Sequence, residues 1–169
     1  VLIEQQVACQ AEYYAAVMID PLSKGPLVLF STAGGMDIEE AAEKAPDQLR
    51  RKEVNILNGF GIEEARRMID GLDLGGAEEA VAALLTSLYD VYRARDAELI
   101  EINPLGNLGD GRVLALDCKF VFDDQAAARH DDLVAKGTPD KLTALEQEAQ
   151  NRGLKYIELS GHVGILANG

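Results

Sequence analysis

Tryptophan is absent from the sequence, and aromatic residues make up only 5% of its 169 residues. Proteins that bind single-stranded nucleic acid usually stack the bases on aromatic side chains, so this scarcity argues against such a function. The net charge of −13 argues against nucleic acid more generally, because a polyanion would be repelled. A nucleotide is not excluded, since a metal ion can bridge acidic side chains to phosphate groups.

Long apolar runs are also absent. No stretch approaches the roughly 18 consecutive apolar residues that a membrane-spanning helix needs, and the first residues have no signal-peptide pattern. We therefore expect a cytoplasmic protein with no membrane partner. Hydrophobic residues account for 47% of the sequence and charged residues for 27%, a composition typical of a globular protein with a buried core.

Cysteine and histidine occur only twice each, as Cys9, Cys118, His130 and His162. Neither pair has the close spacing of a zinc site, so zinc is not expected. The two cysteines lie far apart in the sequence, and we expect two reduced thiols.

The two ends of the sequence are unusual for a complete chain. The first residue is not methionine, and the last residues, Asn168 and Gly169, directly follow the apolar run 163–167. Natural termini are more often polar. We therefore interpret residues 1–169 as a single domain that forms part of a longer protein.

Strand and helix patterns mix along the sequence. Apolar or alternating runs predict strands at residues 1–8, 12–20, 27–32, 54–57, 98–105, 113–122, 156–159 and 163–167. Periodic apolar residues and capping patterns predict helices at residues 37–44, 62–70, 77–95, 123–133 and 138–152. Because the order has no strict strand–helix–strand repeat, we expect an α+β fold, with a mostly antiparallel sheet and helices packed on one side.

Local patterns make some of these predictions more specific. The turn-rich segment 20–26 predicts a hairpin, and Asp37 with Glu40 forms a capping-box pattern at a helix start. The helix at 123–133 is expected to be exposed, with His130 on its surface. Apolar residues at helical spacing predict core packing for the long helix: Val81, Leu84, Leu85, Leu88 and Val91.

Polar residues recur on both strands of the hairpin predicted at 98–122. Glu101 and Asn103 are two residues apart, so their side chains point to the same face of the first strand. Asp117 and Lys119 likewise share a face of the second strand. If the turn lies midway between the strands, the two polar faces coincide.

Converging carboxylate and amide oxygens are suitable ligands for magnesium, which keeps water and phosphate oxygens in its remaining positions. The alternative interpretation is that these residues are ordinary solvent-facing strand positions. Asn103 and Pro104 favour the metal site, because both are poor strand residues and proline removes a ladder donor. A strand that interrupts its own pattern at an asparagine indicates a constraint other than strand pairing.

The segment Glu101-Ile-Asn-Pro-Leu, followed by Leu116-Asp-Cys-Lys, resembles the β subunit of succinyl-CoA synthetase, with fourteen residues from Asn103 to Asp117. Other blocks resemble that subunit in the same order: Glu12-Tyr-Tyr, Val17-Met-Ile-Asp, Phe30-Ser-Thr-Ala-Gly-Gly-Met-Asp-Ile-Glu and Leu159-Ser-Gly-His-Val-Gly-Ile-Leu-Ala-Asn-Gly. Because the blocks keep their order over nearly the whole chain, the sequence is identified as a member of this family of ATP-grasp carboxylate–CoA ligases.

The resemblance implies a ligase of the tricarboxylic acid cycle that couples ATP or GTP cleavage to joining a carboxylic acid with coenzyme A, through an acyl phosphate and a phosphohistidine. It assigns the nucleotide's Mg²⁺ to Asn103 and Asp117, and binding of the carboxylate substrate to Asn168. Glu101 and Lys119 are expected beside these ligands without binding the metal. The metal would neutralise charge on the transferring phosphoryl group.

The resemblance also implies an ATP-grasp half-domain, with residues 1–169 as its C-terminal half. The N-terminal half, which supplies most nucleotide contacts, and a following flavodoxin-like domain are absent. In the family, the phosphorylated histidine and the CoA site belong to a partner α subunit, so His162 is not expected to be the phosphohistidine. We expect no ligase activity from these 169 residues alone.

Two residues depart from the family pattern. Cys118 stands where many relatives have Gly or Ala, and Ala33 stands where some have Glu. Because of the second difference, we interpret Ser31 and Gly34–Gly35 as a strand-to-helix turn rather than a nucleotide loop. The carboxylic acid and the nucleotide base stay open: a malate–CoA ligase, a citryl-CoA synthetase, an ATP-citrate lyase subunit and a non-catalytic α+β interaction module are the alternatives.

Overall fold

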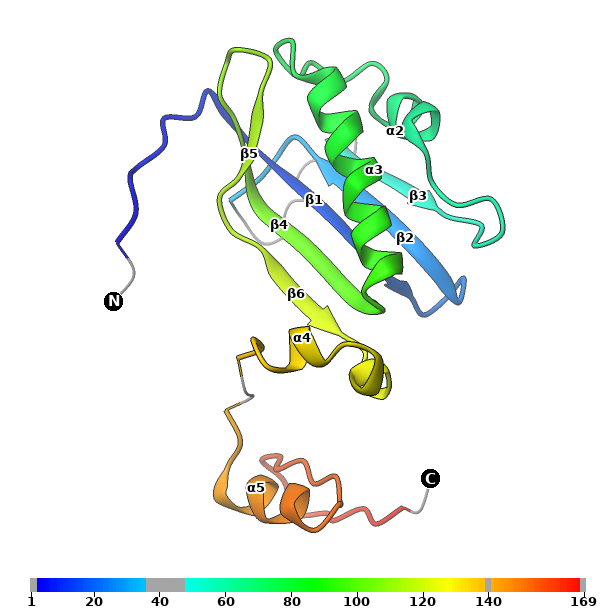
Figure 1. The fold of residues 1–169 in the computed structure, drawn as a ribbon, viewed down its shortest axis with the longest axis vertical. Coiled ribbons are helices and arrows are strands. Elements are labelled where there is room, and N and C mark those ends of the chain that lie inside the picture. Colours follow the sequence, from blue (N-terminus) through cyan, green and yellow to red (C-terminus); the bar gives the residue numbers. More distant parts are fainter. Residues whose placement is uncertain (1–2, 36–47, 139–140, 168–169) are drawn as a thin grey trace. The chain divides into compact units, whose positions relative to one another are not determined.

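The computed structural model describes residues 3–35, 48–138 and 141–167 (Figure 1). The chain forms two compact units, Val1–His130 and Asp131–Gly169, and the single domain expected over residues 1–169 stays a prediction. The first unit contains a six-stranded antiparallel sheet in the order β3-β2-β1-β4-β5, with β6 also paired to β4. The α+β fold and the antiparallel sheet are thereby confirmed.

β1 (Ala11–Asp20) and β2 (Gly25–Ser31) form the predicted hairpin. Asp20 organises its turn: the carboxylate accepts a hydrogen bond from the Ser23 N–H at 2.9 Å, and the carbonyl accepts one from the Lys24 N–H at 2.9 Å. The hydrogen bonds from Ser23 also hold the pKa of Asp20 below its ordinary value. No strand occurs in residues 3–9. The prediction of a strand at residues 1–8 is therefore wrong for residues 3–8, which the structure describes.

β3 (Leu49–Glu53) is the edge strand next to β2. The sequence placed a strand at 54–57 instead, and that prediction is wrong. The physical reason is that an edge strand is often rich in charged residues, which discourage pairing with another sheet. The segment Leu49-Arg-Arg-Lys-Glu therefore lacks the apolar pattern that identifies a buried strand.

β4 (Ala97–Asn107) lies beside β1 and pairs on its other side with β5 (Val113–Ala115) and β6 (Lys119–Phe122). The predicted hairpin is present, but its second strand is interrupted at residues 116–118. The turn is closed by the Leu108 N–H, which donates to the Arg112 carbonyl at 3.0 Å.

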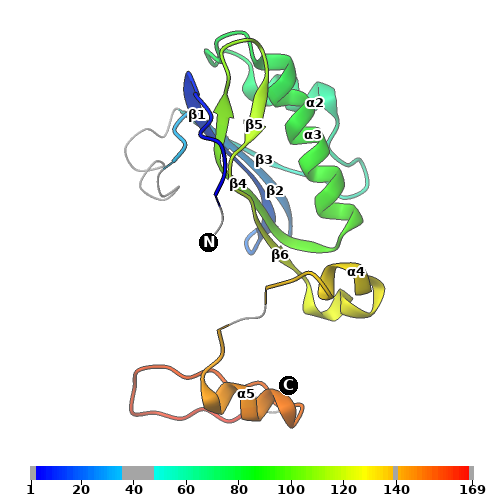
Figure 2. The same cartoon turned by 60° about the vertical axis from the view of Figure 1, so that its left-hand side comes forward.

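Two helices, α2 (Ile62–Ile69) and α3 (Glu78–Ala94), cover one face of the sheet (Figure 2). Both agree with the predicted helices. α2 ends just before Gly71, whose φ of +76° lies in the left-handed region that glycine adopts without strain.

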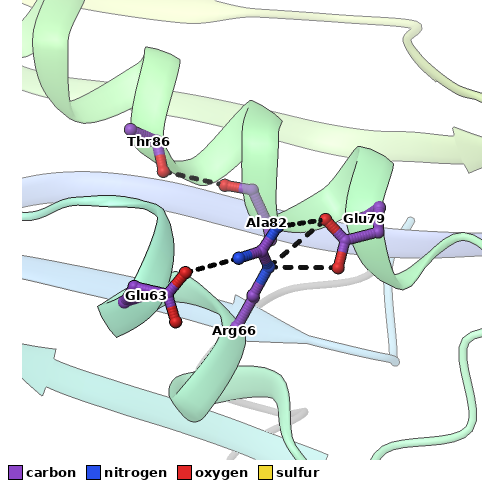
Figure 3. A network of polar contacts seen from close by, with 5 residues as sticks. All are labelled: Glu63, Arg66, Glu79, Ala82 and Thr86. Atoms are coloured by element: carbon purple, nitrogen blue, oxygen red, sulfur yellow. Dashed lines mark hydrogen bonds and ion pairs between the residues drawn. The ribbon is translucent and has the colours of Figure 1, made fainter.

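Arg66 on α2 connects the two helices (Figure 3). Its Nε lies 3.1 Å from Oε1 of Glu79 on α3, its Nη2 lies 2.8 Å from Oε2 of Glu79, and it also pairs with Glu63 on its own helix. The Glu79 contact raises the pKa of Arg66 and lowers that of Glu79. Because these side chains are exposed, water and salt screen their attraction.

The main core lies between the sheet and the two helices. Val81, Leu85 and Leu88 of the predicted apolar stripe are buried there and Leu84 packs against it, whereas Val91 is 45% exposed and was wrongly expected in the core. A smaller cluster covers the opposite face of the sheet, with the following members: Tyr14, Ala16, Met18, Leu27, Leu29 and Leu99.

The segment after β6 contains a short 3-10 helix, η2 (Asp124–Arg129), and a separate single turn, α4 (Asp131–Val134). The single helix predicted at 123–133 is therefore broken at His130. His130 is also buried rather than on the surface, because its Nε2 lies 2.8 Å from the Asp96 carboxylate and its ring packs edge-on against Phe122.

In the second unit, α5 (Ala144–Asn151) begins at Thr143, which forms a capping box with Glu146. The sequence placed this start at Thr138, because Pro139 after it resembled a first helical residue; Pro139 itself lies outside the described residues. The strands predicted at 156–159 and 163–167 are absent from this described segment. Their apolar side chains are exposed, and a strand needs a pairing partner to form.

The capping box predicted at Asp37 and Glu40, its helix through residue 44, and Asn168 lie outside the described residues. Within the part of the chain that the structure describes, no helix is long and apolar enough to cross a membrane.

Candidate metal and nucleotide site

Glu101 and Asn103 lie on the face of β4 that is opposite to the helices. Ile100 and Ile102 point into the main core, and side chains alternate along a strand, so their neighbours Glu101 and Asn103 point the other way. The prediction that these two polar residues share a face agrees with this arrangement.

β4 changes its pattern directly after Asn103. The peptide bond from Asn103 to Pro104 is cis, and the register with β1 shifts between Tyr13 and Ala15 at this level. Leu105 faces the core, although it lies three residues after Ile102. The alternation of side chains therefore changes at Asn103, as the sequence pattern indicated, although β4 itself continues to Asn107.

A glycine loop reaches Asn103 from the end of β2. The Gly35 N–H donates a 2.7 Å hydrogen bond to Asn103 Oδ1. The same loop lies on β1, where the Gly34 N–H donates to the Glu12 carbonyl at 2.9 Å. Sequence reasoning treated this loop as a plain turn and missed the contact; the Gly-Gly pair directly after a strand was the available signal.

Asp117 lies in the interruption between β5 and β6. Leu105 pairs with Ala115 on one side of it, and Glu101 pairs with Lys119 on the other. Counting two residues inward from either pair brings Asn103 opposite Asp117. The two residues predicted as metal ligands therefore occupy matching positions on neighbouring segments of the same hairpin.

Asp117 is exposed, and its Oδ1 accepts a 2.8 Å hydrogen bond from the Cys118 N–H. Partial desolvation raises the pKa of the Cys118 thiol, and the negative charges of Asp117 and Glu101 raise it further. Cys118 and Cys9 are both free thiols, as expected.

The donor set fits Mg²⁺ with a nucleotide better than a metal held by the protein alone. Asn103 offers an amide oxygen and Asp117 a carboxylate, and among the described residues no group of three or more His, Cys, Asp or Glu side chains is arranged to hold a metal. Magnesium is commonly bound by one or two carboxylates, with water and phosphate oxygens completing its octahedron. Glu101 and Lys119 are paired across the same hairpin, two residues away from Asn103 and Asp117 respectively.

Asn107, at the end of β4, forms a buried hydrogen-bond network that the sequence prediction missed. Its Nδ2 donates to the Tyr13 hydroxyl and to the Leu74 carbonyl, both at 2.9 Å, and its Oδ1 accepts from the Gly109 N–H at 2.9 Å. The network ties the sheet to the loop between α2 and α3, on the helix side of the sheet and on the opposite face from Glu101 and Asn103.

Solved structures with a similar fold include enzymes whose names or ligands contain coenzyme A. An ATP citrate lyase from Methanothrix soehngenii, in complex with citrate and coenzyme A, matches with a TM-score of 0.66 and 20% identity over 88% of this chain and 34% of that one. A dinucleotide-forming acetyl-coenzyme A synthetase from Ca. Korarchaeum cryptofilum matches with a TM-score of 0.52 and 17% identity, over 67% of this chain and 53% of that one. At such identities the likeness concerns the fold.

Curated relatives are more similar in sequence. The β subunit of an ADP-forming succinate–CoA ligase from Nautilia profundicola is 39% identical over all of this chain and 44% of its own length. A GDP-forming counterpart from Thermus thermophilus is 38% identical over all of this chain and 45% of its length. The chain thus spans less than half the length of these relatives, and the resemblance expected from the sequence motifs is confirmed.

A family model described as an ATP-grasp domain matches residues 1–107. This match contains β1, the glycine loop and β4, and hence Asn103, while Asp117 follows ten residues after its end. Since the match covers more than half of the sequence, the chain belongs to the ATP-grasp family.

Proposed function

We propose that this chain is the part of an acid–CoA ligase that holds the Mg²⁺ of a bound ATP or GTP, in a protein of the succinate–CoA ligase β-subunit type. The observation that supports the proposal most strongly is the position of Asn103 opposite Asp117, where the second strand of the hairpin is interrupted. The succinate–CoA ligase β subunits that are 35–41% identical support the substrate class.

Each residue of the site has a defined role in the proposal. Asn103 and Asp117 supply an amide and a carboxylate oxygen to the metal, and Mg²⁺ bound there neutralises charge on the nucleotide phosphates. Glu101 and Lys119 set the charge beside the ligands: the ammonium of Lys119 offsets one carboxylate and can orient toward a phosphate oxygen. Asn168, outside the described residues, is proposed to bind the carboxylate substrate.

The complete reaction needs more than this chain. We propose that a CoA-binding α subunit carrying the phosphohistidine is the partner, that the protein works in the cytoplasm, and that the 169 residues alone form no acyl-CoA.

The full-length protein with its α subunit is expected to make acyl-CoA from succinate with ATP or GTP. An assay that also offers malate and citrate distinguishes the related ligases. Acyl-CoA formation by the 169 residues alone would contradict the expected inactivity.

Binding of Mg–ADP to the full-length protein tests the site itself. Asn103→Ala and Asp117→Ala are each expected to weaken this binding by at least about tenfold, because even indirect partners of a metal ligand contribute that much. When EDTA removes the metal, the variants and the natural protein are expected to bind ADP equally. The oxygens of Asn103 and Asp117 that the variants lack contribute to ADP binding only by holding the metal. Isothermal titration calorimetry measures both affinities.

Asp110→Ala is the matched control. Asp110 is an exposed carboxylate of the same hairpin, but it lies in the turn and pairs with Arg112 at 2.6 Å, so its loss is expected to leave Mg–ADP binding unchanged. Unchanged binding in both site variants, or equal weakening in the control, would refute the metal assignment. The protein would then be better described as a non-catalytic interaction module.

A further inference from the structure

The glycine loop, of which residues 32–35 are described, follows β2, lies across β1 and contacts Asn103 of β4 through Gly35. Its path is fixed by two backbone hydrogen bonds to groups far away in the sequence: Gly34 N–H to the Glu12 carbonyl, and Gly35 N–H to Asn103 Oδ1, 68 residues away. Ser31 supports the start of the loop, because its buried hydroxyl oxygen accepts a 3.1 Å hydrogen bond from the Ala33 N–H. Three adjacent strands are thus connected by the loop at the level of Asn103.

Both glycines are required by the geometry, for different reasons. A β-carbon at Gly34 would overlap the backbone of Tyr13, with only 2.6 Å to its nitrogen and still less to its carbonyl group. Gly35 has a φ of +72°, and a β-carbon there would lie 2.7 Å from the Glu12 carboxylate. Gly34 therefore meets rigid backbone, whereas Gly35 meets the movable end of a side chain.

The hydrogen bond from Gly35 determines which end of the Asn103 amide faces the loop. An N–H can donate only to the amide oxygen, so the reversed amide would place two donors against each other. The same oxygen has two lone pairs, so one hydrogen bond and one metal bond are compatible. An NH₂ group presented in its place cannot bind a metal.

From this geometry we infer that the Gly34–Gly35 loop is a positioning element of the metal site, which holds the Asn103 amide with its oxygen directed to receive Mg²⁺. The inference rests on the metal role proposed for Asn103 and adds a function for the loop. Gly34 acts through its close contact with β1, and Gly35 acts through its backbone N–H. Both are positioning residues that do not touch the nucleotide or the metal.

The first test is independent of metal. Hydrogen–deuterium exchange at the Gly35 amide is measured in the full-length protein without nucleotide. Asn103→Ala is expected to accelerate this exchange by about tenfold, because it removes the acceptor. Asn103→Asp keeps an oxygen acceptor and is expected to restore protection. Unchanged exchange in Asn103→Ala would overturn the inference.

The second test uses Gly34→Ala, which lifts the loop from β1. The apparent Mg²⁺ affinity of the full-length protein with saturating ADP is expected to fall by about tenfold, as is usual when a residue that orients a metal ligand is lost, while ADP affinity in EDTA stays unchanged. Gly61→Ala is the control, because Gly61 has an ordinary φ of −114° and no atom within 4 Å of the added carbon.

The outcomes separate the two proposals. If Asn103→Ala weakens Mg²⁺ binding but a folded Gly34→Ala variant does not, the positioning role is wrong and the metal site stands. If Asn103→Ala leaves Mg²⁺ binding unchanged, the metal site itself is wrong. If Gly34→Ala does not fold, the exchange measurement with the two Asn103 variants decides the inference.

Discussion

Tyr13 and Tyr89 both carry buried hydroxyl groups, but their surroundings differ. The Tyr13 hydroxyl donates to the Leu74 carbonyl at 3.2 Å and accepts from Asn107 at 2.9 Å. The Tyr89 hydroxyl has no hydrogen-bond partner among the described residues, although its ring contacts Phe60 and Tyr92. At the scale of single residues, we therefore expect the Tyr13 hydroxyl, which is hydrogen-bonded, to stabilise the fold, and the Tyr89 hydroxyl not to.

Replacement of each tyrosine by phenylalanine tests this difference. Tyr13→Phe is expected to lower the free energy of unfolding by about 1–3 kcal/mol, because it leaves Asn107 and Leu74 with one hydrogen bond fewer in a buried place. Tyr89→Phe is expected to leave it unchanged or to raise it by up to about 1 kcal/mol, since a buried hydroxyl without a partner costs free energy. Urea denaturation measures both, and a larger loss for Tyr89→Phe would contradict the account.

Asp96 gives a prediction about pH. Hydrogen bonds from His130 and then Arg129 hold the pKa of its carboxyl below the ordinary value of 3.8. Because the pKa is lower in the folded state, the stabilisation is complete above the ordinary pKa and is lost as the pH falls through the folded pKa. The free energy of unfolding should therefore contain a contribution from Asp96 that disappears in acid.

The variant Asp96→Asn isolates this contribution, because asparagine also tolerates the positive φ of +48° at this position. The variant is expected to be less stable than the natural protein at neutral pH. The difference should shrink as the pH falls below about 4, where the natural carboxyl becomes protonated. Denaturant titrations across this range measure it, and a constant difference at all pH values would be evidence against the contact.

At the scale of elements, apolar patterning predicted the parts that are buried. The two helices and the hairpin around β4 follow from side-chain periodicity. The hairpin of β1 and β2 follows from continuous apolar runs, because these two strands are buried on both faces. β3 was misplaced because its charged residues at the sheet edge carry no such pattern. The Gly-Gly pair marked the loop as a special segment but not its partner Asn103, since 68 residues separate Gly35 from Asn103 and only the assembled sheet brings them together.

Arg66 supports a prediction about how α2 and α3 are held together. Most of their association comes from buried apolar side chains such as Met68 and Leu85, whereas the Arg66–Glu79 pair is exposed. Arg66→Ala is therefore expected to reduce the free energy of unfolding only slightly, and by still less in high salt. Thermal unfolding at low and high salt measures the effect, and a loss that does not depend on salt would rule out an electrostatic origin.

At the scale of the whole molecule, all buried side chains in the described residues belong to the unit Val1–His130. The described part of Asp131–Gly169 contains no buried residue, which explains why strands predicted there did not form: the apolar pattern was present but nothing in that unit covers it. The family resemblance predicted Asn103 and Asp117 as the metal ligands, and the strand register places these two residues opposite each other.

Removal of residues 131–169 tests this division of the chain. The remaining unit keeps both hydrophobic clusters, so it is expected to unfold cooperatively with a midpoint within about 4 °C of that of the 169-residue chain, a shift that corresponds to about 1 kcal/mol. Calorimetry of the two chains measures this. Loss of the cooperative transition would mean that the second unit completes the core.

The most direct test of the central claim is the position of the metal in a crystal structure of the full-length protein with Mn²⁺ and ADP. The account predicts anomalous density for Mn²⁺ at roughly 2.0–2.3 Å from both Asn103 Oδ1 and an Asp117 carboxylate oxygen, with ADP phosphate oxygens among its other ligands. Mn²⁺ bound with ADP on other side chains, with Asn103 and Asp117 contacting neither metal nor phosphate, would contradict it.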